Sequence, residues 1–255
     1  MIDTHCHLYA EGLLSEIDLV MERAIRVGVN KFYLPAIDSS THGAMMKLEE
    51  RFNDKCFSMI GLHPCSVKEN YINELEIIIQ LLKQRSFAAI GETGLDFYWD
   101  TSFKKEQFLA LEQQIELALE YELPLILHTR NAMQETINII KNYSTTNLRG
   151  IFHCFGGTAT EADQIIETGF LLGIGGVVTY KKSGLAEVLK NIDLVNIVLE
   201  TDAPYLPPVP YRGKRNESSY IIEVAKKLAE IKNVSFGEVE RVTNLNAEKI
   251  FRKIG

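Results

Sequence analysis

The sequence has no long hydrophobic run. Its longest apolar stretch, residues 170–178, is much shorter than the roughly 20 residues with which a helix crosses a bilayer, so we expect no membrane span. The N-terminus also lacks a basic segment followed by an apolar core, which is the pattern of a secretory signal. We therefore expect a protein that is not exported.

Cysteine is scarce, and positive charge is not in excess. The four cysteines, Cys6, Cys56, Cys65 and Cys154, have neither the density nor the spacing of a disulfide scaffold, which predicts a reducing cytoplasm. There are 27 Lys and Arg residues against 34 Asp and Glu residues, so the formal net charge is −7. This balance argues against a broad nucleic-acid-binding surface but permits a local cationic site or a metal site.

The composition is that of an ordinary globular protein, with 46% hydrophobic and 24% charged residues. Eight short runs rich in strand-forming residues recur at 1–7, 31–37, 56–62, 87–92, 125–128, 150–153, 171–178 and 197–202. Several of them are apolar without alternation, as expected of strands that are covered on both faces. Segments with helical periodicity lie between them, at 14–27, 44–52, 72–82, 103–121, 132–142, 159–168 and 220–231.

Strands that alternate with helices predict a parallel sheet. Eight such units in 255 residues predict an α/β protein with a (β/α)8 TIM barrel, and a doubly wound open sheet is the alternative. Because no linker divides the chain, residues 1–255 are expected to form a single domain. Residues 234–255 are expected to add one or two helices that cover the barrel, and residues 203–216 a long ordered loop at the active-site end.

Polar residues follow several of the predicted strands. His5 and His7 are two residues apart on the first run, so their imidazoles are expected on one face. Polar side chains stand at the C-terminal ends of four further runs: Glu92, His128, His153 and Asp202. In a parallel barrel these ends meet at one mouth. Four imidazoles and two carboxylates are costly to bury together unless a cation binds them, so we expect a divalent-metal site with room for two ions.

Seven motifs cover nearly the whole chain: Ile-Asp-Thr-His-Cys-His at 2–7, Gly-Leu-His-Pro at 61–64, Gly-Glu-Thr-Gly-Leu-Asp-Phe at 91–97, His-Thr-Arg at 128–130, His-Cys-Phe-Gly-Gly at 153–157, Glu-Thr-Asp-Ala-Pro-Tyr-Leu at 200–206 and Tyr-Arg-Gly-Lys-Arg-Asn at 211–216. In this order they closely resemble the TatD family of metal-dependent deoxyribonucleases, a branch of the amidohydrolase-like barrels. The sequence departs from the family pattern at Ser218, where proline is usual, and at Gly156, where serine is frequent.

The resemblance implies a set of metal ligands. One divalent ion would be held by His5, His7, Glu92 and Asp202, and the other by Glu92, His128 and His153, with Glu92 as the bridge. Histidine favours Zn²⁺, whereas carboxylates and phosphate chemistry suit Mg²⁺ or Mn²⁺, so all three ions stay open.

Further candidates surround these residues. His63 is either a phosphate or orienting contact or a structural cap, and Arg130 either contacts phosphate or forms a salt bridge at a helix start. Glu200 shares a strand face with Asp202 and is expected to orient water or a ligand. Cationic residues of the predicted top loops either contact substrate or are solvated charges: Lys181, Lys182, Arg212, Lys214 and Arg215. Aromatic residues either stack on bases or close the barrel mouth: Phe97, Tyr98, Trp99 and Tyr205.

Three residues are not expected to take part. Cys6 and Cys154 alternate to the face opposite their neighbouring histidines, which argues against a thiolate site. His42 is expected in a surface loop before a helix. No Gly-x-Ser-x-Gly motif, phosphate-binding loop or dinucleotide-binding glycine pattern is present.

Together these observations and the resemblance predict hydrolysis of DNA phosphodiesters by metal-activated water. Asp202 is expected to accept the water proton, with Glu92 and Glu200 as further catalytic residues. The resemblance suggests 3′ to 5′ exonuclease action on single-stranded DNA, with no membrane association and no obligate protein partner. A binuclear-metal amidohydrolase acting on a small amide, lactone or ester is the alternative, because the same barrel supports that chemistry. A non-catalytic binding protein that is stabilised by metal is a third possibility.

Overall fold

The structure is a computed structural model that describes residues 1–252. Its centre consists of eight short parallel strands: β1 (Ile2–Asp3), β2 (Lys31–Leu34), β3 (Cys56–Ser58), β4 (Ile90–Asp96), β5 (Leu125–Arg130), β6 (Gly150–Phe152), β7 (Leu171–Ile174) and β8 (Ile197–Leu199). They are hydrogen-bonded in chain order as β1-β2-β3 and as β4-β5-β6-β7-β8. Each strand overlaps one of the eight predicted runs.

Backbone hydrogen bonds join these two groups of strands into a closed barrel. Between β3 and β4, the Ile60 amide donates to the Ala89 carbonyl at 3.0 Å. Between β8 and β1, the Thr4 amide donates to the Leu199 carbonyl at 3.1 Å. A closed sheet has no free edge. The predicted TIM barrel is therefore confirmed, and the doubly wound alternative is wrong.

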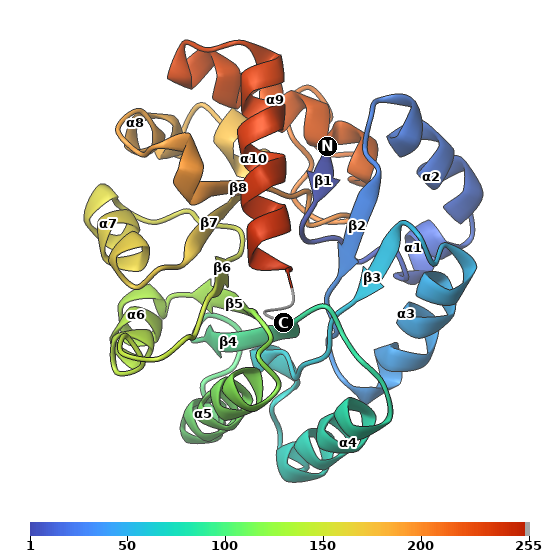
Figure 1. The fold of residues 1–255 in the computed structure, drawn as a ribbon, viewed down its shortest axis with the longest axis vertical. Coiled ribbons are helices and arrows are strands. Elements are labelled where there is room, and N and C mark those ends of the chain that lie inside the picture. The colour runs from blue at the N-terminus through green and yellow to red at the C-terminus, as the bar shows by residue number, and fades with distance from the viewer. Residues whose placement is uncertain (253–255) are drawn as a thin grey trace.

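Helices surround the strands, as Figure 1 shows. Their bounds are α1 (Glu11–Leu14), α2 (Ile17–Arg26), α3 (Ser39–Arg51), α4 (Tyr71–Gln84), α5 (Lys104–Glu120), α6 (Met133–Lys141), α7 (Ala159–Glu167), α8 (Leu185–Leu189), α9 (Ile221–Lys232) and α10 (Phe236–Ile250). Single 3-10 turns are η1 (Pro64–Ser66), η2 (Gly176–Thr179), η3 (Leu194–Asn196) and η4 (Ser218–Tyr220). The short helix α8 is absent from the prediction, because its 5 residues contain little more than one turn of periodicity.

The helix α5 shows how periodicity becomes packing. Its predicted apolar face is buried against the barrel through Leu111, Ile115 and Ala118. The same face also buries Gln107, whose side-chain oxygen accepts from the Asp96 amide at 2.9 Å and whose nitrogen donates to the Asp96 carbonyl at 3.1 Å. The helix thereby fixes the C-terminal end of β4, next to the polar cluster described below.

The barrel interior changes from apolar to polar along its axis. Residues two apart on a strand share a face, so Ile126 and His128 both point inward, as do Ile151 and His153. The isoleucines belong to a buried apolar cluster that includes Ile250 of α10. The histidines lie one step further along, at the carboxyl ends of β5 and β6. The apolar layer is thus the floor of the barrel, and the imidazoles are at its mouth.

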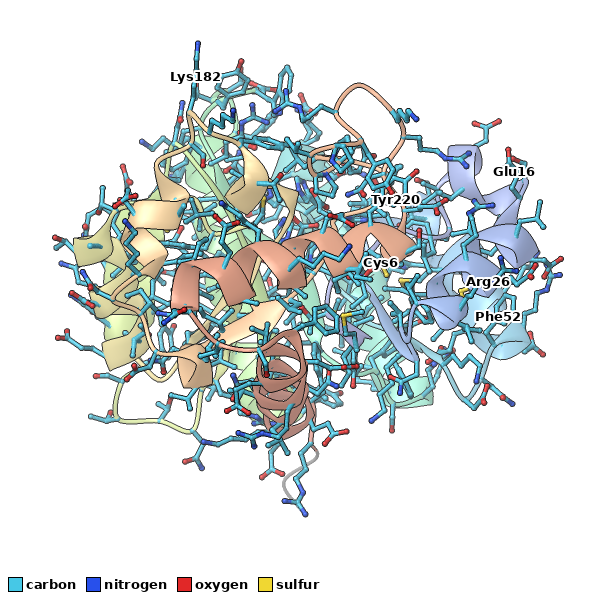
Figure 2. All side chains as sticks on the ribbon, turned by 90° about the horizontal axis from the view of Figure 1, so that it is seen from above. Cys6, Glu16, Arg26, Phe52, Lys182 and Tyr220 are labelled. Atoms are coloured by element: carbon cyan, nitrogen blue, oxygen red, sulfur yellow. The ribbon has the colours of Figure 1, made fainter. Side chains whose placement is uncertain are left out.

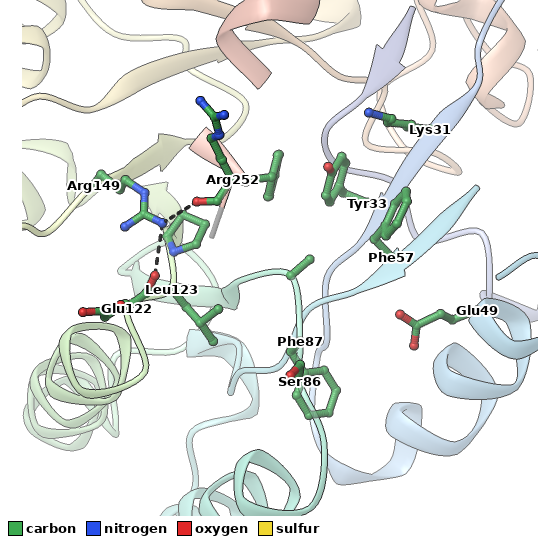
Figure 3. A pocket seen from close by; sticks show the side chains of 13 residues that line it. Lys31, Tyr33, Glu49, Phe57, Ser86, Phe87, Glu122, Leu123, Arg149 and Arg252 are labelled. Carbon is green, nitrogen blue, oxygen red and sulfur yellow. Dashed lines mark hydrogen bonds between the residues drawn. The ribbon is translucent and has the colours of Figure 1, made fainter. Parts of the chain in front are cut away.

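The helix α10 lies across the barrel at the floor end (Figure 1). Its last turn is held by Arg149, which donates from Nε to the Ile250 carbonyl at 3.2 Å and from Nη2 to the Arg252 carbonyl at 3.1 Å. Figure 3 shows Arg149 in the wall of a pocket at this end. Lys182 lies on the opposite side of the molecule from α10 (Figure 2).

The predicted C-terminal helix is thus confirmed as α10, and residues 253–255 lie outside the described part. Residues 203–216 form the predicted loop between β8 and η4. Within residues 1–252, no helix is long and apolar enough to cross a membrane.

Candidate metal centre

His5 and His7 meet at the mouth of the barrel, although both lie beyond the end of β1 rather than on it. Their Nε2 atoms are 3.3 Å apart, and they lie 3.1 and 3.6 Å from Oε2 of Glu92. Oδ1 of Asp202 is 3.8 Å from the first imidazole and 3.5 Å from the second. The thiol of Cys6, between them, donates from Sγ to the Tyr33 carbonyl of β2 at 3.6 Å, so it points away from the histidines as predicted.

The other oxygen of Glu92 faces a second group of imidazoles. Oε1 lies 2.9 Å from Nδ1 of His128, 3.4 Å from Nε2 of His63 and 3.4 Å from Nε2 of His153. One buried carboxylate therefore contacts both groups, which is the position expected of a bridging ligand. The ligand assignment itself stays a prediction.

The grouping differs from the two sets that the resemblance implies. The ring of His153 stacks on that of His5, with centroids 3.6 Å apart and planes 13° apart. Ligand atoms of His5, His153 and Asp202 lie within 4.8 Å of one another, and so do those of His63, Glu92 and His128. His153 thus lies between the two groups, and His63 is as close to Glu92 as His153 is.

Two outer carboxylates fix the orientation of the imidazoles. Oδ2 of Asp96 lies 2.9 Å from Nε2 of His128, and Oε1 of Glu200 lies 3.1 Å from Nδ1 of His153. Both imidazoles therefore present their remaining nitrogen to Glu92. An acceptor behind a ligating histidine fixes its tautomer and ring orientation. Glu200 is completely buried in this position, which is that of an orienting group behind His153.

Asp96 has no role in the sequence prediction, although a signal for it exists. Glu92 and Asp96 are four residues apart on β4, so both belong to the same set of alternating residues. Asp96 is therefore a second acidic residue on the same face of β4, closer to the carboxyl end of the strand and so to the mouth of the barrel. The alternation of β4 therefore indicates Asp96 as soon as Glu92 is chosen.

Burial and charge oppose each other at the centre. Burial alone would raise the pKa of Glu92, but the imidazoles of His63, His5 and His153 hold it well below its usual range. Burial alone would lower the pKa of His153, but the charges of Glu200 and Glu92 raise it to about 10. The pKa of His5 is lowered, first by burial and then by the charge of His153.

These observations fit a divalent cation. Buried carboxylates stay charged here only because positive charge is close, and a cation would replace the imidazole protons that supply it. Imidazole nitrogens and carboxylate oxygens within 4.8 Å of one another are donors that Zn²⁺, Mn²⁺ or Mg²⁺ accepts. Two residues at the centre also have left-handed backbone conformations, with φ of 56° at Asp202 and 48° at Cys154. Such conformations, which cost about 1–3 kcal/mol each, cluster at functional sites.

Two of the predicted substrate contacts lie beside this centre. Arg130 ends β5, two residues after His128. The ring of Tyr205 is 5.8 Å from that of His7, and its amide donates to the Asp202 carbonyl at 2.7 Å. Their contact with substrate stays a prediction.

The predicted cationic contacts lie on the loops after β7 and β8. Lys181 is exposed. The guanidinium of Arg212 lies 4.0 Å above the ring of Tyr180. Arg215 lies 3.4 Å from a carboxylate oxygen of Glu16 and so ties its loop to the α1 side of the barrel. Contact of these three residues with substrate also stays a prediction.

The expectation for His42 is wrong. It lies within α3 and is buried, and burial lowers its pKa. The helix begins earlier than predicted because Asp38 caps it: its side chain accepts from the Ser40 amide at 3.1 Å, and Thr41 completes a capping box. Neither family departure replaces a candidate ligand, since Ser218 begins η4 and Gly156 lies in the loop after β6.

A parallel barrel whose carboxyl end gathers imidazoles around a shared carboxylate has the architecture of metal-dependent hydrolases. Comparison with known proteins specifies the class further. Residues 2–252 match the family model of TatD related DNase. The chain belongs to this family and is a metal-dependent hydrolase of the TatD type.

Similar proteins agree with this assignment over almost their whole lengths. The metal-dependent hydrolase YabD of Bacillus subtilis (strain 168) is 38% identical over 253 residues, which cover 99% of each chain. YcfH of Escherichia coli (strain K12), also described as a metal-dependent hydrolase, is 31% identical over 98% of this chain and 95% of its own. The crystal structure of YjjV, a TatD homolog from Escherichia coli K12, matches with a TM-score of 0.93 and 28% identity, covering 98% of this chain and 97% of that one.

Proposed function

We propose that this protein hydrolyses DNA phosphodiesters, and that it acts as a 3′ to 5′ exonuclease on single strands. The observation that carries hydrolysis is the buried Glu92 carboxylate, which contacts imidazoles on both of its oxygens at the mouth of the barrel. Membership of a family described as DNases favours a nucleic acid as the substrate. The arginine and aromatic residues at the rim are suited to phosphates and bases.

The metal ligands proposed are His5, His7, Glu92 and Asp202 for one ion, and Glu92, His128 and His153 for the other. Bound there, Mg²⁺, Mn²⁺ or Zn²⁺ would supply positive charge to the phosphate oxygens and lower the pKa of the attacking water.

Residues of the chain complete the reaction. Asp202 is the buried carboxylate that is proposed to accept the proton of the attacking water. His63 accepts at Nδ1 from the Cys65 amide at 3.0 Å, so its neutral ring carries the proton on Nε2. Nε2 lies 3.4 Å from Oε1 of Glu92, and we propose that its N–H donates to a phosphate oxygen of the substrate. Glu200 holds His153 from behind.

Metal-stripped protein restored with Mg²⁺, Mn²⁺ or Zn²⁺ tests the proposal on end-labelled single-stranded and double-stranded DNA. The expected result is a ladder that shortens from the 3′ end, forms only with metal and is absent in Asp202→Asn. The variant should lose turnover far more than DNA affinity, and it also controls for contaminating nuclease. Metal-loaded protein that cleaves no DNA but hydrolyses small amides or esters would contradict the proposal and favour the amidohydrolase alternative.

We also propose a cytoplasmic location, because the thiols of Cys6, Cys56, Cys65 and Cys154 are free. Fractionation of cells, with detection of the protein by antibody, tests this. Recovery outside the cytoplasmic fraction would contradict it.

A further inference from the structure

Two aromatic rings and one guanidinium form a compact, exposed cluster at the mouth of the barrel. Tyr98 and Trp99 meet edge to face, with centroids 4.9 Å apart and planes at 86°. The guanidinium of Arg130 lies 3.9 Å from the Tyr98 ring centroid and 5.1 Å from that of Trp99. The two aromatic residues are 53% and 67% exposed. We call Tyr98, Trp99 and Arg130 the rim platform.

The rim platform is fixed to the metal centre through Asp96. One oxygen of this carboxylate, Oδ1, accepts from the amides of Tyr98 and Trp99 at 2.9 and 3.1 Å. Its other oxygen, Oδ2, lies 2.9 Å from Nε2 of His128. Arg130 stands opposite Asp96 in the β4–β5 register. A single side chain thus holds both the backbone of the aromatic pair and a candidate metal ligand, so the platform keeps a fixed position relative to the centre.

Ordinary packing does not account for this cluster. Large aromatic side chains are highly buried on average. Tyr and Trp that stay exposed beside a functional site are often binding residues. Arg130 forms no salt bridge with any carboxylate of residues 1–252, so its N–H groups are not engaged by an acid. A guanidinium can stack by its flat face while it donates from its edge. The platform therefore offers flat surfaces for a base and free donors for a phosphate. It lies next to the metal centre, because Arg130 pairs in register with Asp96, which contacts His128.

We propose that the rim platform binds a nucleobase of single-stranded DNA next to the phosphodiester at the metal centre. This inference rests on the proposed function and names the part of the substrate that these residues recognise. Stacking on an aromatic ring tolerates every base, because every base has a π face. The platform would accordingly hold the strand without selecting its sequence.

The protein carries its own probe for this contact, because Trp99 is its single tryptophan. Wild-type protein loaded with Mg²⁺ would be titrated with a short phosphorothioate-linked oligothymidylate, which resists cleavage, while tryptophan emission is recorded. The same titration would use an abasic oligonucleotide of equal length, which has the phosphates but no bases. We expect quenching by the base-bearing strand and little by the abasic one. Equal quenching by both, or by neither, would overturn the proposal.

Variants supply a second readout, the polarisation of a dye-labelled oligothymidylate. Trp99→Leu keeps an apolar side chain but removes the aromatic face, and its Kd should rise roughly 5- to 150-fold. Trp99→Phe should recover most of the affinity. Leu245→Ala removes an exposed apolar side chain from α10 at the far end of the barrel, and should bind as wild type does. Unchanged binding by Trp99→Leu would contradict a stacking role.

Failure of this inference can be told apart from failure of the proposed nuclease. If unmodified DNA is cleaved but Trp99→Leu leaves KM unchanged, the protein is a nuclease and the platform does not bind a base. If Trp99 is quenched only by base-bearing strands but no DNA is cleaved, the platform stands and the proposed reaction is wrong. If a protein from a cell lysate changes the emission of Trp99 and DNA does not, the cluster is a protein-docking surface and the inference is overturned.

Discussion

Both carboxylate oxygens of Asp96 form hydrogen bonds, so replacing this residue should affect both the adjacent imidazole and the following loop. Oδ2 faces His128, while Oδ1 accepts from two amides of the following loop. Asparagine has the same shape but only one accepting oxygen. Asp96→Asn can therefore accept from the loop only if its NH2 group faces Nε2 of His128, which would move the imidazole proton to Nδ1, the nitrogen that faces Glu92. We expect metal affinity to fall about 10- to 100-fold, as for other residues that orient a ligating histidine.

Competition with a chromophoric chelator measures this affinity directly. Asp100→Asn is the matched control, because Asp100 lies in the same loop but pairs with Lys68 at 2.7 Å and contacts no imidazole. Equal metal affinity in the two variants would show that Asp96 does not position His128.

Gly173 leaves the room that Glu200 occupies behind His153. A Cβ atom at this position would lie 2.3 Å from Oε2 of Glu200 and 3.1 Å from Cα of His153. Gly173→Ala must displace this buried carboxylate, so we expect a loss of about 1–3 kcal/mol in the free energy of unfolding, together with weaker metal binding. Gly156→Ala is the control, since its Cβ would meet nothing closer than 3.9 Å. Urea denaturation and chelator competition check both; two variants with equal stability would contradict this account of Gly173.

The sequence indicates which side chains lie at the mouth of the barrel but not the distances between them. Strand ends predict that His128, His153 and Glu92 converge, and the structure brings them together. The stacking of His153 on His5 could not be predicted, because it depends on how far β1 and β6 rise at the mouth. Arg130 over Tyr98 is likewise a contact between β5 and the loop after β4, and no local pattern specifies it.

Elements at the mouth are joined by an ion pair between α2 and the start of η4. Nε and Nη2 of Arg23 donate to the carboxylate of Glu217, with the shortest distance 2.6 Å. Burial would raise the pKa of Glu217, but the hydrogen bonds from Arg23 and Ser219 lower it. Because the pKa is lower in the folded state than in the unfolded one, the stabilisation is present at neutral pH and is lost as pH falls through the folded value.

Glu217→Gln should therefore destabilise the fold at pH 7 by about 1.5–3 kcal/mol, the contribution of hydrogen bonds to a charged group. The difference from wild type should begin to shrink below the ordinary pKa of 4.5 and vanish below the lowered pKa of the folded protein, where the folded carboxylate also becomes protonated. Urea denaturation across this pH range measures it. Glu230→Gln removes an exposed partner of Lys227 and should change stability by less than about 0.5 kcal/mol. A loss that is equal at every pH would indicate packing rather than charge.

Elements were predictable where they bury a continuous apolar run or a clear helical face. The apolar runs of β5, β6, β7 and β8 and the long helices meet that condition, whereas β1 and β4 also bury acidic side chains. Element boundaries were less predictable. β1 ends at Asp3, because the backbone of residues 4–7 bonds mostly to β8 and the segment after it, and only Cys6 bonds to β2. His5 and His7 accordingly lie just beyond the strand, on either side of Cys6, which forms an isolated parallel bridge with Ala203.

In the whole molecule, the two ends of the barrel differ in composition: one is apolar and the other is polar. Ile250 and the apolar cluster around it close the floor, whereas the imidazoles and carboxylates occupy the mouth. The single domain expected for residues 1–255 stays a prediction. In TIM barrels the mouth carries function and the opposite face carries stability. Stability and metal binding should therefore respond independently to changes at the two ends.

Ile250→Ala tests this independence. Removing a buried isoleucine from the floor should cost about 2–5 kcal/mol, whereas Leu245→Ala, at an exposed position of the same helix, should cost less than about 0.5 kcal/mol. Metal binds only the folded state, so an ion at 100 times its Kd should add about 2.7 kcal/mol to the free energy of unfolding. Because Ile250 belongs to the floor cluster, which contains none of the candidate ligands, that increment should be the same in Ile250→Ala as in wild type. Urea denaturation with and without Mn²⁺ measures both quantities, and a smaller increment in Ile250→Ala would mean that the floor helps to shape the metal centre.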